Sequence, residues 1–222
     1  MNNLVIAVDG PAGAGKSTIA KIIANKLNIN YIDTGAMYRA ITYKCLKNNI
    51  DVENAEEVVA LAKSTEIDFK DNNIYLDKKI VNDEIRTVDV SNNVSKVSKI
   101  KEVRKLLVDV QRNIGSKSSV ILDGRDIGSV VFPNADYKFY LIATPEERGC
   151  RRFKEMRKKG YDVNLDEIIK DIVDRDKMDM NRKFAPLVKA KDALEIDTTG
   201  KTIDDVVDEV VSKIKVYKNN NK

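Results

Sequence analysis

The stretch that decides the fold is Leu4-Val-Ile-Ala-Val-Asp9, followed directly by Gly10-Pro-Ala-Gly-Ala-Gly-Lys-Ser17. The first segment is apolar up to its aspartate and rich in β-branched residues, which is typical of a central parallel strand covered on both faces. The second fits the pattern G-x-x-x-x-G-K-[ST], and residues 16–27 continue with apolar side chains at helical spacing. Strand, glycine-rich loop and helix therefore follow one another, which predicts a phosphate-binding loop.

The chemistry expected of this loop follows from its backbone. Glycine lets successive N–H groups turn inward, and the N-terminus of the next helix adds partial positive charge, so the loop can surround the oxygens of a nucleoside triphosphate. We expect Lys16 to neutralise the β- and γ-phosphates of ATP and Ser17 to ligate Mg²⁺. The predicted ATP-binding residues are Gly10, Pro11, Ala12, Gly13, Ala14, Gly15, Lys16, Ser17 and Thr18.

Further strand-like segments alternate with helical patterns along the chain. They are Val120–Asp123, Tyr137–Ala143 and Ala193–Asp197. This alternation predicts an α/β fold of the P-loop NTPase type with a parallel, five-stranded sheet, and the length of 222 residues suits one domain over residues 1–222. Asp123 ends its strand beside the expected phosphate loop, where its carboxylate either holds Mg²⁺ or supports the loop, or else only caps the strand.

Residues 64–100 break the alternation. Short strand-like pieces are separated by polar turns at Asp71–Asn73 and Asp77–Lys78, and a polar helical stretch follows around Val88 to Val97. Turn residues between short strands are typical of an antiparallel meander. We therefore predict a small antiparallel subdomain inserted at one edge of the main sheet.

Composition excludes several classes of protein. The chain has no histidine, which rules out Ser-His-Asp hydrolases, histidine-ligated metals and imidazole proton shuttles. Its two cysteines, Cys45 and Cys150, match no metal or redox spacing, and no apolar run is long enough for export or for a membrane span. We expect a cytoplasmic protein without a membrane partner.

The net charge of +4, from 39 basic and 35 acidic residues, is concentrated in one segment. Residues 146–159 hold seven basic and three acidic side chains, which accounts for the whole excess and argues against general nucleic-acid binding. Thr144 and Pro145 mark the start of a helix there. Arg148, Arg151 and Arg152 would share one helical face, which is either a solvated basic surface or a helical lid over ATP at about 145–165.

A second group of charges has helical spacing near the C-terminal third of the chain. Arg175, Asp179 and Arg182 are spaced i, i+4 and i+7, and Ala185-Pro186 would end their helix. As an exposed ion-pair face the three would add only tenths of a kcal/mol to stability. The alternative is that they bind a substrate.

Several further blocks resemble the bacterial cytidylate kinases, from about residue 4 to residue 212. Besides the phosphate loop, the blocks are Ile32-Asp-Thr-Gly-Ala-Met-Tyr-Arg39, Glu84-Ile-Arg-Thr87, Asp123-Gly-Arg-Asp-Ile-Gly128, Val131-Phe-Pro133, Asn181-Arg182 and Ala185-Pro-Leu187. The resemblance implies ATP-dependent phosphorylation of CMP and dCMP. We also expect Mg²⁺ as a cofactor, a monomer, and no nucleic-acid partner. The resemblance also implies that the insertion binds CMP and that 145–165 is the lid.

The resemblance assigns roles to individual residues. It implies catalytic roles for Lys16, Arg125, Arg148, Arg152 and Arg182, and metal binding by Ser17 and Asp123. It also implies that Thr34, Arg39 and Arg125 bind the phosphate of CMP, and that Ser95, Arg104 and Asp126 lie toward its base. Arg175 and Asp179 would contact the sugar, and Arg182 would contact the phosphate or the transferring group. Met178 departs from the pattern, because some relatives carry another arginine there.

This reaction suits a chain without histidine. The second pKa of a nucleoside monophosphate is about 6, so at pH 7 the attacking oxygen is already ionised and no general base is needed. At Asp126 a carboxylate would accept from the 4-amino group of cytosine and repel the 4-oxo group of uracil. The alternatives are a surface turn at Asp126, another P-loop kinase for UMP, AMP or a non-nucleotide acceptor, and a regulatory or nucleic-acid-binding P-loop protein.

Overall fold

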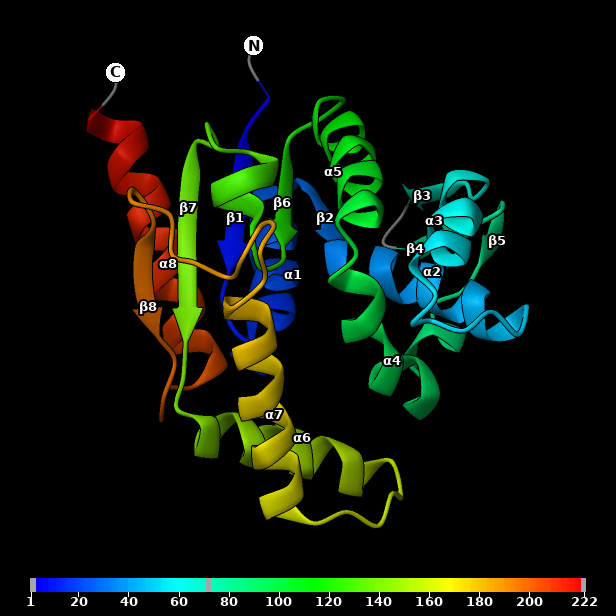
Figure 1. Ribbon diagram of the computed structural model, residues 1–222. Coiled ribbons are helices and arrows are strands. Elements are labelled where there is room, and N and C mark those ends of the chain that lie inside the picture. The colour runs from blue at the N-terminus through cyan, green and yellow to red at the C-terminus, as the bar shows by residue number, and fades with distance from the viewer. Residues whose placement is uncertain (1–2, 71–72, 221–222) are drawn as a thin grey trace.

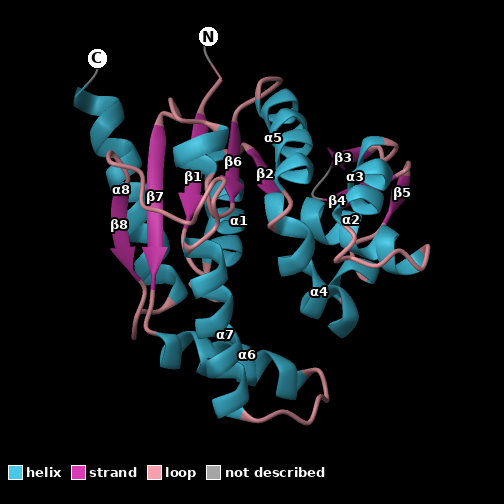
Figure 2. Cartoon of the chain, in the orientation of Figure 1, coloured by secondary structure: helices cyan, strands magenta, loops and turns pink. Residues whose placement is uncertain are grey.

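The computed structural model describes residues 3–70 and 73–220, and its centre is a five-stranded sheet (Figures 1 and 2). The strand order is β2-β6-β1-β7-β8, and every neighbouring pair is parallel. The strands are β2 (Asn30–Asp33), β6 (Val120–Asp123), β1 (Val5–Asp9), β7 (Tyr137–Ile142) and β8 (Leu194–Asp197). The predicted parallel sheet and its strand number are confirmed.

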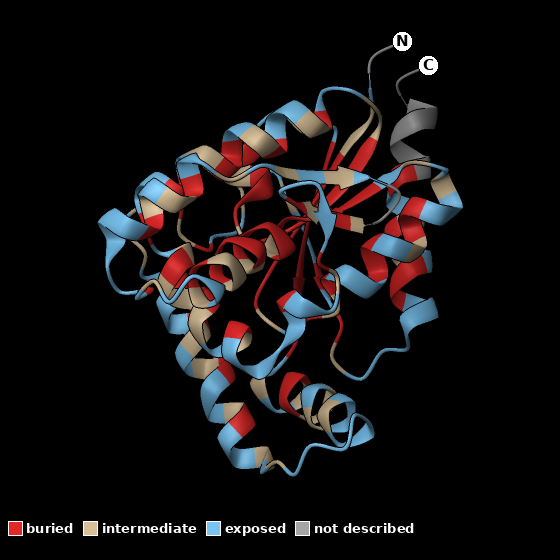
Figure 3. Cartoon of the chain, turned by 90° about the vertical axis from the view of Figure 1, so that its right-hand side faces the viewer, coloured by how far each residue is buried: buried red, intermediate tan, exposed pale blue. Residues whose placement is uncertain are grey.

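Helices cover both faces of this sheet. Those on the faces are α1 (Lys16–Leu27), α2 (Thr34–Lys47), α5 (Lys101–Gly115) and α8 (Ile203–Asn220), and the others described are α3 (Ala55–Lys63), α4 (Val88–Ser98), α6 (Pro145–Lys158) and α7 (Leu165–Met180). Successive strand residues point to opposite faces, so Ile6 and Val8 pack with α1 and α8 while Ala7 packs with α2 and α5. Burial is concentrated in the strands between these layers (Figure 3).

A second, smaller sheet lies beside α2 and α3 (Figure 1). Its strands β3 (Ile67–Lys70), β4 (Asn73–Leu76) and β5 (Lys79–Ile80) are antiparallel in the order β3-β4-β5. The predicted antiparallel strands and the following helix are thus present, and of the predicted turn at Asp71–Asn73 the first two residues lie outside the described ranges. Ile74 and Val97 belong to the apolar cluster that also contains Ala7 of the main sheet, so this region has no core of its own.

The pair α6 and α7 lies beyond the carboxyl ends of β1 and β7 (Figure 1). Thr144 caps α6 as predicted, because its hydroxyl accepts a hydrogen bond from the Glu147 amide at 3.2 Å and Pro145 is the first helical residue. No helix among the described residues is long and apolar enough to cross a membrane.

The end of α7 corrects one prediction. The helix stops at Met180 instead of continuing to Ala185-Pro186, so Arg182 lies beyond it and does not share a helical face with Arg175 and Asp179. Ala185 has a left-handed backbone with φ of 51°, and the Leu187 amide donates to the Asp179 carbonyl at 2.8 Å. The chain therefore folds back over the end of the helix, which a spacing rule cannot detect.

Candidate active site

The phosphate loop is packed closely against strand β7, and this contact explains its first glycine. Gly10 has a φ of 142°, and a Cβ atom added there would lie 2.0 Å from the Leu141 carbonyl oxygen. Gly15, at the start of α1, has a left-handed φ of 85°. Both positions need glycine because larger residues would clash or be strained. The loop is therefore held in one shape by the sheet beneath it.

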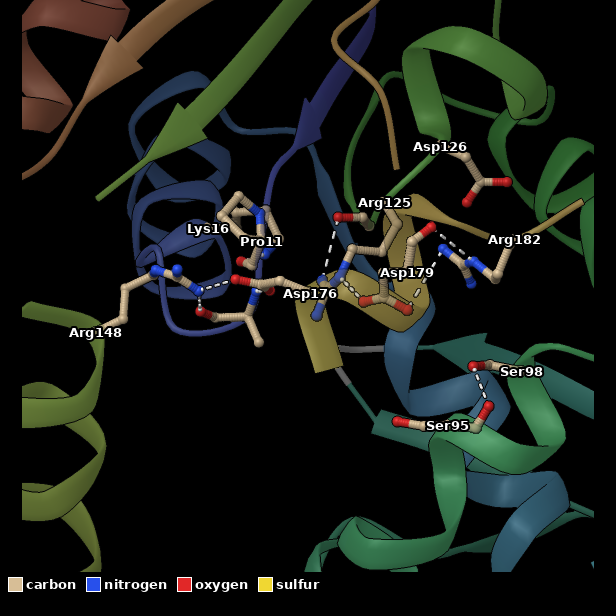
Figure 4. Close-up of polar contacts among 12 residues, drawn as sticks. Pro11, Lys16, Ser95, Ser98, Arg125, Asp126, Arg148, Asp176, Asp179 and Arg182 are labelled. Carbon is tan, nitrogen blue, oxygen red and sulfur yellow. Dashed lines mark hydrogen bonds and ion pairs between the residues drawn. The ribbon is translucent and has the colours of Figure 1, made fainter. Parts of the chain in front are cut away.

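Lys16 is buried at the centre of this loop. Its Nζ atom donates a hydrogen bond to the Pro11 carbonyl oxygen at 2.6 Å (Figure 4). Burial, followed by the charge of Arg125, lowers the pKa of Lys16 to about 7, although the charges of Asp123 and Asp9 oppose the shift. An ammonium group in this position is destabilised until anionic oxygens approach it.

Asp123 and Ser17 meet at the carboxyl end of β6. The Ser17 hydroxyl donates to Asp123 Oδ2 at 2.7 Å, and the Tyr31 hydroxyl donates to Asp123 Oδ1 at 2.8 Å. Burial raises the pKa of Asp123, and the charge of Asp33 adds to that rise. Two adjacent oxygen ligands suit Mg²⁺, and no group of three or more acidic, cysteine or histidine side chains in the described ranges could enclose a metal. The pair therefore fits an ion that is shared with phosphate and water.

A buried ion pair links the α6–α7 pair to the phosphate loop (Figure 4). Arg148 Nη1 lies 2.5 Å from Asp176 Oδ2 and donates to the Ala12 carbonyl at 3.0 Å, while its Nε donates to the Ala143 carbonyl at 2.9 Å. The Ala12 amide in turn donates to Asp176 Oδ1 at 3.3 Å. In this arrangement every guanidinium contact of Arg148 is to protein, and Asp176 occupies one amide of the loop.

Asp33, at the start of α2, holds two arginines. Its Oδ2 lies 2.7 Å from Arg39 and 3.4 Å from Arg86, and its Oδ1 caps α2 by accepting from the Ala36 amide. Burial alone would raise the pKa of Asp33, but the guanidinium charges, Arg39 first, keep it below its usual range. Arg86 comes from the short helical turn Glu84–Arg86 beside the small sheet, so this carboxylate connects that region to the end of β2.

Arg104 and Asp126 form a second buried ion pair at 2.6 Å. Arg104 is 1% exposed, lies over the Tyr38 ring and donates to the Ser98 carbonyl at 3.0 Å. Its Nε atom is buried and has no hydrogen-bond partner among the described residues. The carboxylate of Asp126 is held in place and can accept hydrogen bonds, and the Nε–H of Arg104 can donate one. Together they can recognise a planar group by the pattern of donors and acceptors along its edge.

Arg125 connects this region to α7. Its Nε donates to Asp179 Oδ2 at 2.9 Å, and Arg182 Nη2 lies 3.6 Å from Asp179 Oδ1 (Figure 4). Burial opposes ionisation of Asp179, but both arginines lower its pKa, Arg125 more strongly. Arg175, from the same helix, is half-buried, and desolvation and then the charge of Arg125 lower its pKa to about 10. Three guanidinium groups thus surround one carboxylate.

The structure brings most, but not all, of the predicted site residues together at the carboxyl edge of the sheet. Thr34 donates to the Asp123 carbonyl at 2.7 Å, next to Ser17. In contrast, Arg152 pairs with Glu155 on the exposed side of α6, and Ser95 uses its carbonyl to accept from the Ser98 hydroxyl on α4, apart from Asp126 (Figure 4). Neither contacts the phosphate loop in this structure.

Five residues that the sequence did not single out contribute to this site: Asp9, Tyr31, Asp33, Arg86 and Asp176. Three of them carried a usable signal, because Asp9 ends the strand before the glycine loop, and Asp33 and Arg86 lie in the quoted blocks Ile32–Arg39 and Glu84–Thr87. For Asp176 no local pattern exists, since its partner Ala12 lies 164 residues away in sequence.

Comparison with known proteins identifies the family. The family model described as cytidylate kinase matches residues 6–216. The chain is 74% identical over 214 residues to the cytidylate kinase of Clostridioides difficile (strain 630), covering 96% of this chain and 99% of that protein. The chain belongs to the cytidylate kinase family. A second member, from Alkaliphilus oremlandii (strain OhILAs), is 57% identical over 215 residues, covering 97% of this chain and 99% of that protein.

Solved structures that resemble this cytidylate kinase family member share its fold at low sequence identity. A gluconokinase from Sinorhizobium meliloti 1021 has a TM-score of 0.51 at 12% identity and covers 98% of this chain and 94% of its own. An uncharacterized protein from Eubacterium ventriosum ATCC 27560 has a TM-score of 0.54 at 13% identity and covers 96% of this chain and 99% of its own. These likenesses are to the fold alone.

Proposed function

We propose that the protein transfers the γ-phosphoryl group of ATP to CMP and dCMP, which gives ADP and CDP or dCDP. The observation that carries the proposal is the meeting of two anion-binding centres at one edge of the sheet. Lys16 and the phosphate loop lie at the end of β1, and Arg125 lies next to them after β6, with Asp179 and Arg182 beyond it. Membership of the cytidylate kinase family supplies the expected acceptor.

The proposed reaction depends on positioning and charge. The phosphate loop binds the ATP phosphates, and Lys16 exchanges its bond to the Pro11 carbonyl for phosphate oxygens. Ser17 and Asp123 would hold Mg²⁺, which neutralises phosphate charge when bound. Arg39, Arg125 and Arg182 would hold the CMP phosphate in line with ATP. The acceptor oxygen is already ionised at neutral pH, so the site needs no general base.

Acceptor selectivity is proposed to come from the Arg104–Asp126 pair. Arg104 holds the carboxylate of Asp126 in place at 2.6 Å, and both are buried. In that position Asp126 would accept from the cytosine amino group and repel the carbonyl of uracil. Arg175 and Asp179 would contact the sugar, and Ser95 would approach the base only if α4 moves toward Asp126.

Two regions are proposed to cover the bound substrates. Residues 64–100, with the small sheet and α4, would form the CMP-binding subdomain, and residues 145–165 would form a lid over ATP. Closure of the lid would have to release Arg148 from Asp176 and bring Arg152 toward the phosphates, because both side chains now contact protein groups. We propose that the enzyme acts as a cytoplasmic monomer, which light scattering of the purified protein tests.

The test of this function is an ADP-release assay across acceptors. The panel contains CMP, dCMP, UMP, AMP, GMP and a blank without acceptor, each with ATP and Mg²⁺. We expect fast turnover with CMP and dCMP, at least tenfold slower turnover with UMP, and background rates with the others, because a single well-placed polar contact is worth about 1–3 kcal/mol. Faster turnover of AMP or UMP than of CMP would contradict the proposal.

A further inference from the structure

Asp9 is a buried carboxylate that the mechanism above does not use. It is the last residue of β1, immediately before Gly10 of the phosphate loop, and it is 5% exposed. Its Oδ1 accepts from the Ile127 amide at 2.8 Å, and its Oδ2 accepts from the Gly128 amide at 2.7 Å. Two charge-assisted bonds to consecutive amides fix both the position and the orientation of a loop.

The two amides belong to the segment that carries the acceptor-side residues. Arg125 and Asp126 come directly before Ile127, and residues Ile127–Val131 form a single π-helical turn. The amides of Val130 and Val131 both donate to the Asp126 carbonyl, so the turn closes on Asp126 itself. π-helical turns are uncommon and are often found at functional sites, where they orient side chains that a regular helix would point elsewhere.

The space around this contact leaves little freedom. A Cβ atom added at Gly128 would lie 3.1 Å from Lys138 Cδ and 3.4 Å from Asp9 Oδ2. The loop is therefore confined between β7 on one side and the carboxylate on the other. Burial raises the pKa of Asp9 to about 7, although the amides of Gly128 and Ile127 oppose the rise. The contact thus carries a cost in stability that a neutral side chain would avoid.

We propose that Asp9 is a positioning residue that sets the acceptor-side loop relative to the phosphate loop. Asp9 and Gly10 are neighbours in the chain, so one point of the backbone fixes where ATP binds, and the carboxylate next to it fixes where Arg125 and Asp126 lie. The distance between donor and acceptor is then set through a single residue of β1. This inference rests on the proposed function, because it assumes that the two loops hold the two substrates.

The test compares Asp9→Asn with a matched variant of a carboxylate that accepts a bond from the other end of β1. The substituted amide keeps one acceptor oxygen, but its NH₂ group faces the second backbone amide, so one of the two bonds is lost. Asp136, which is exposed, accepts from the Val5 amide at 2.7 Å. Asp136→Asn keeps the one acceptor oxygen that this bond needs, so it makes the same change of charge at a carboxylate bonded to β1 without touching the acceptor-side loop.

The expected results separate positioning from stability. Asp9→Asn should lower kcat/KM for CMP by about 10- to 100-fold, because small misplacements of reacting groups cost that much. The preference for CMP over UMP should fall as Asp126 shifts, while the Kd for a non-hydrolysable MgATP analogue stays within about threefold of wild type. Asp136→Asn should leave all of these values within about twofold. Gly128→Ala would place a methyl group 3.1 Å from Lys138 Cδ and 3.4 Å from Asp9 Oδ2. It crowds the same contact without changing a charge, and we expect it to show the Asp9→Asn pattern.

Three outcomes would overturn the inference. The first is an unchanged kcat/KM and CMP preference in Asp9→Asn. The second is an equal loss of MgATP-analogue affinity and CMP turnover, which indicates a general structural role. The third, decisive if Asp9→Asn does not fold, is a folded Gly128→Ala with wild-type kinetics. A wild-type enzyme that did not turn over CMP would contradict the proposed function instead, so the two failures are distinguishable.

Discussion

The donor side of the site, proposed to hold ATP, and the acceptor side, proposed to hold CMP, differ in whether their polar groups already have hydrogen-bond partners within the protein. On the donor side, Lys16 donates to Pro11 and the Ala12 amide donates to Asp176, so the ammonium group and one amide of the phosphate loop already have protein partners. On the acceptor side, buried guanidinium nitrogens have no hydrogen-bond partner among the described residues: Nε of Arg39, Arg104 and Arg175, and Nη2 of Arg182. Buried donors without partners each cost about 1–3 kcal/mol.

This difference indicates two modes of binding. In the proposed binding mode, ATP would replace the existing bonds of Lys16 and of the Ala12 amide, so at these two groups its phosphates would gain only the difference between new and old contacts. In the proposed binding mode, CMP would bring hydrogen-bond acceptors to guanidinium nitrogens that have no protein partner among the described residues, so these contacts would replace no bond within the protein. The acceptor side is therefore where selectivity is expected, since a wrong ligand leaves those buried groups unsatisfied.

The largest effect should come from the donor side. Lys16→Ala should lower kcat by about 10³-fold, because it removes a fixed charge from the transferring phosphoryl group. The matched control is Lys26→Ala on the same helix, whose ammonium is half exposed and pairs with Asp208 at the surface. Circular dichroism should show that both variants fold. Turnover of Lys16→Ala within about threefold of wild type would mean that the phosphate loop has another function.

On the acceptor side, Asp126→Asn should narrow selectivity. The ratio of kcat/KM for CMP to that for UMP should fall by about 10- to 100-fold, because an amide no longer repels the uracil carbonyl. The same substitution leaves Arg104 charged and buried without its ion-pair partner, so melting temperatures must be measured to keep the two effects separate. An unchanged ratio in a folded variant would remove Asp126 from base recognition.

Asp176→Asn tests the contacts by which Asp176 holds Arg148 and the Ala12 amide on the donor side. The variant leaves the Arg148 charge unpaired at a buried position, which should lower the stability of the nucleotide-free protein by about 1–3 kcal/mol. MgATP should then raise the melting temperature more than it does for wild type, because phosphate restores the missing negative charge.

Asp174→Asn is the control for that experiment, since Asp174 lies on the same helix in an exposed ion pair at 3.8 Å from Lys177. We expect its melting temperature and its response to MgATP to match wild type, as surface pairs contribute little. An Asp176→Asn protein as stable as this control would show that the buried pair adds nothing to the stability of the nucleotide-free protein.

The smallest predicted effect is a proton uptake. The pKa of Lys16 is lowered to about 7, and phosphate oxygens should raise it again, so ATP binding at pH 8 should take up at most about one proton per molecule. Calorimetry in two buffers of different ionisation enthalpy measures this, and Lys16→Ala should abolish it.

The folded protein also binds fewer protons at Lys16 than the unfolded chain from pH 7 to 10.5, so this group makes stability rise with pH there.

The sequence predicts the sheet and the phosphate loop because both depend on local patterns. The apolar strand at residues 4–9, the glycines of the loop after it and the Thr144 cap of α6 each depend on residues only a few positions apart in the sequence. The end of α7 could not be predicted, because it depends on the backbone of Ala185 and on a bond from Leu187 back to Asp179. The sequence shows Asp9 at the end of its strand but could not predict the bonds that Asp9 accepts, since the partners are 118 and 119 residues away in the sequence.

The shared core of the small sheet restricts how the acceptor can enter. Ile85 and Val94 from the inserted region lie in one apolar cluster with Leu122 of β6 and Met37 of α2. If the region swung away as a separate unit and uncovered even about 200 Å², the cost would be about 5 kcal/mol. Entry of the acceptor should therefore leave α4 packed against α2. A chimera that exchanged residues 64–100 between two kinases would need to exchange α2 with them.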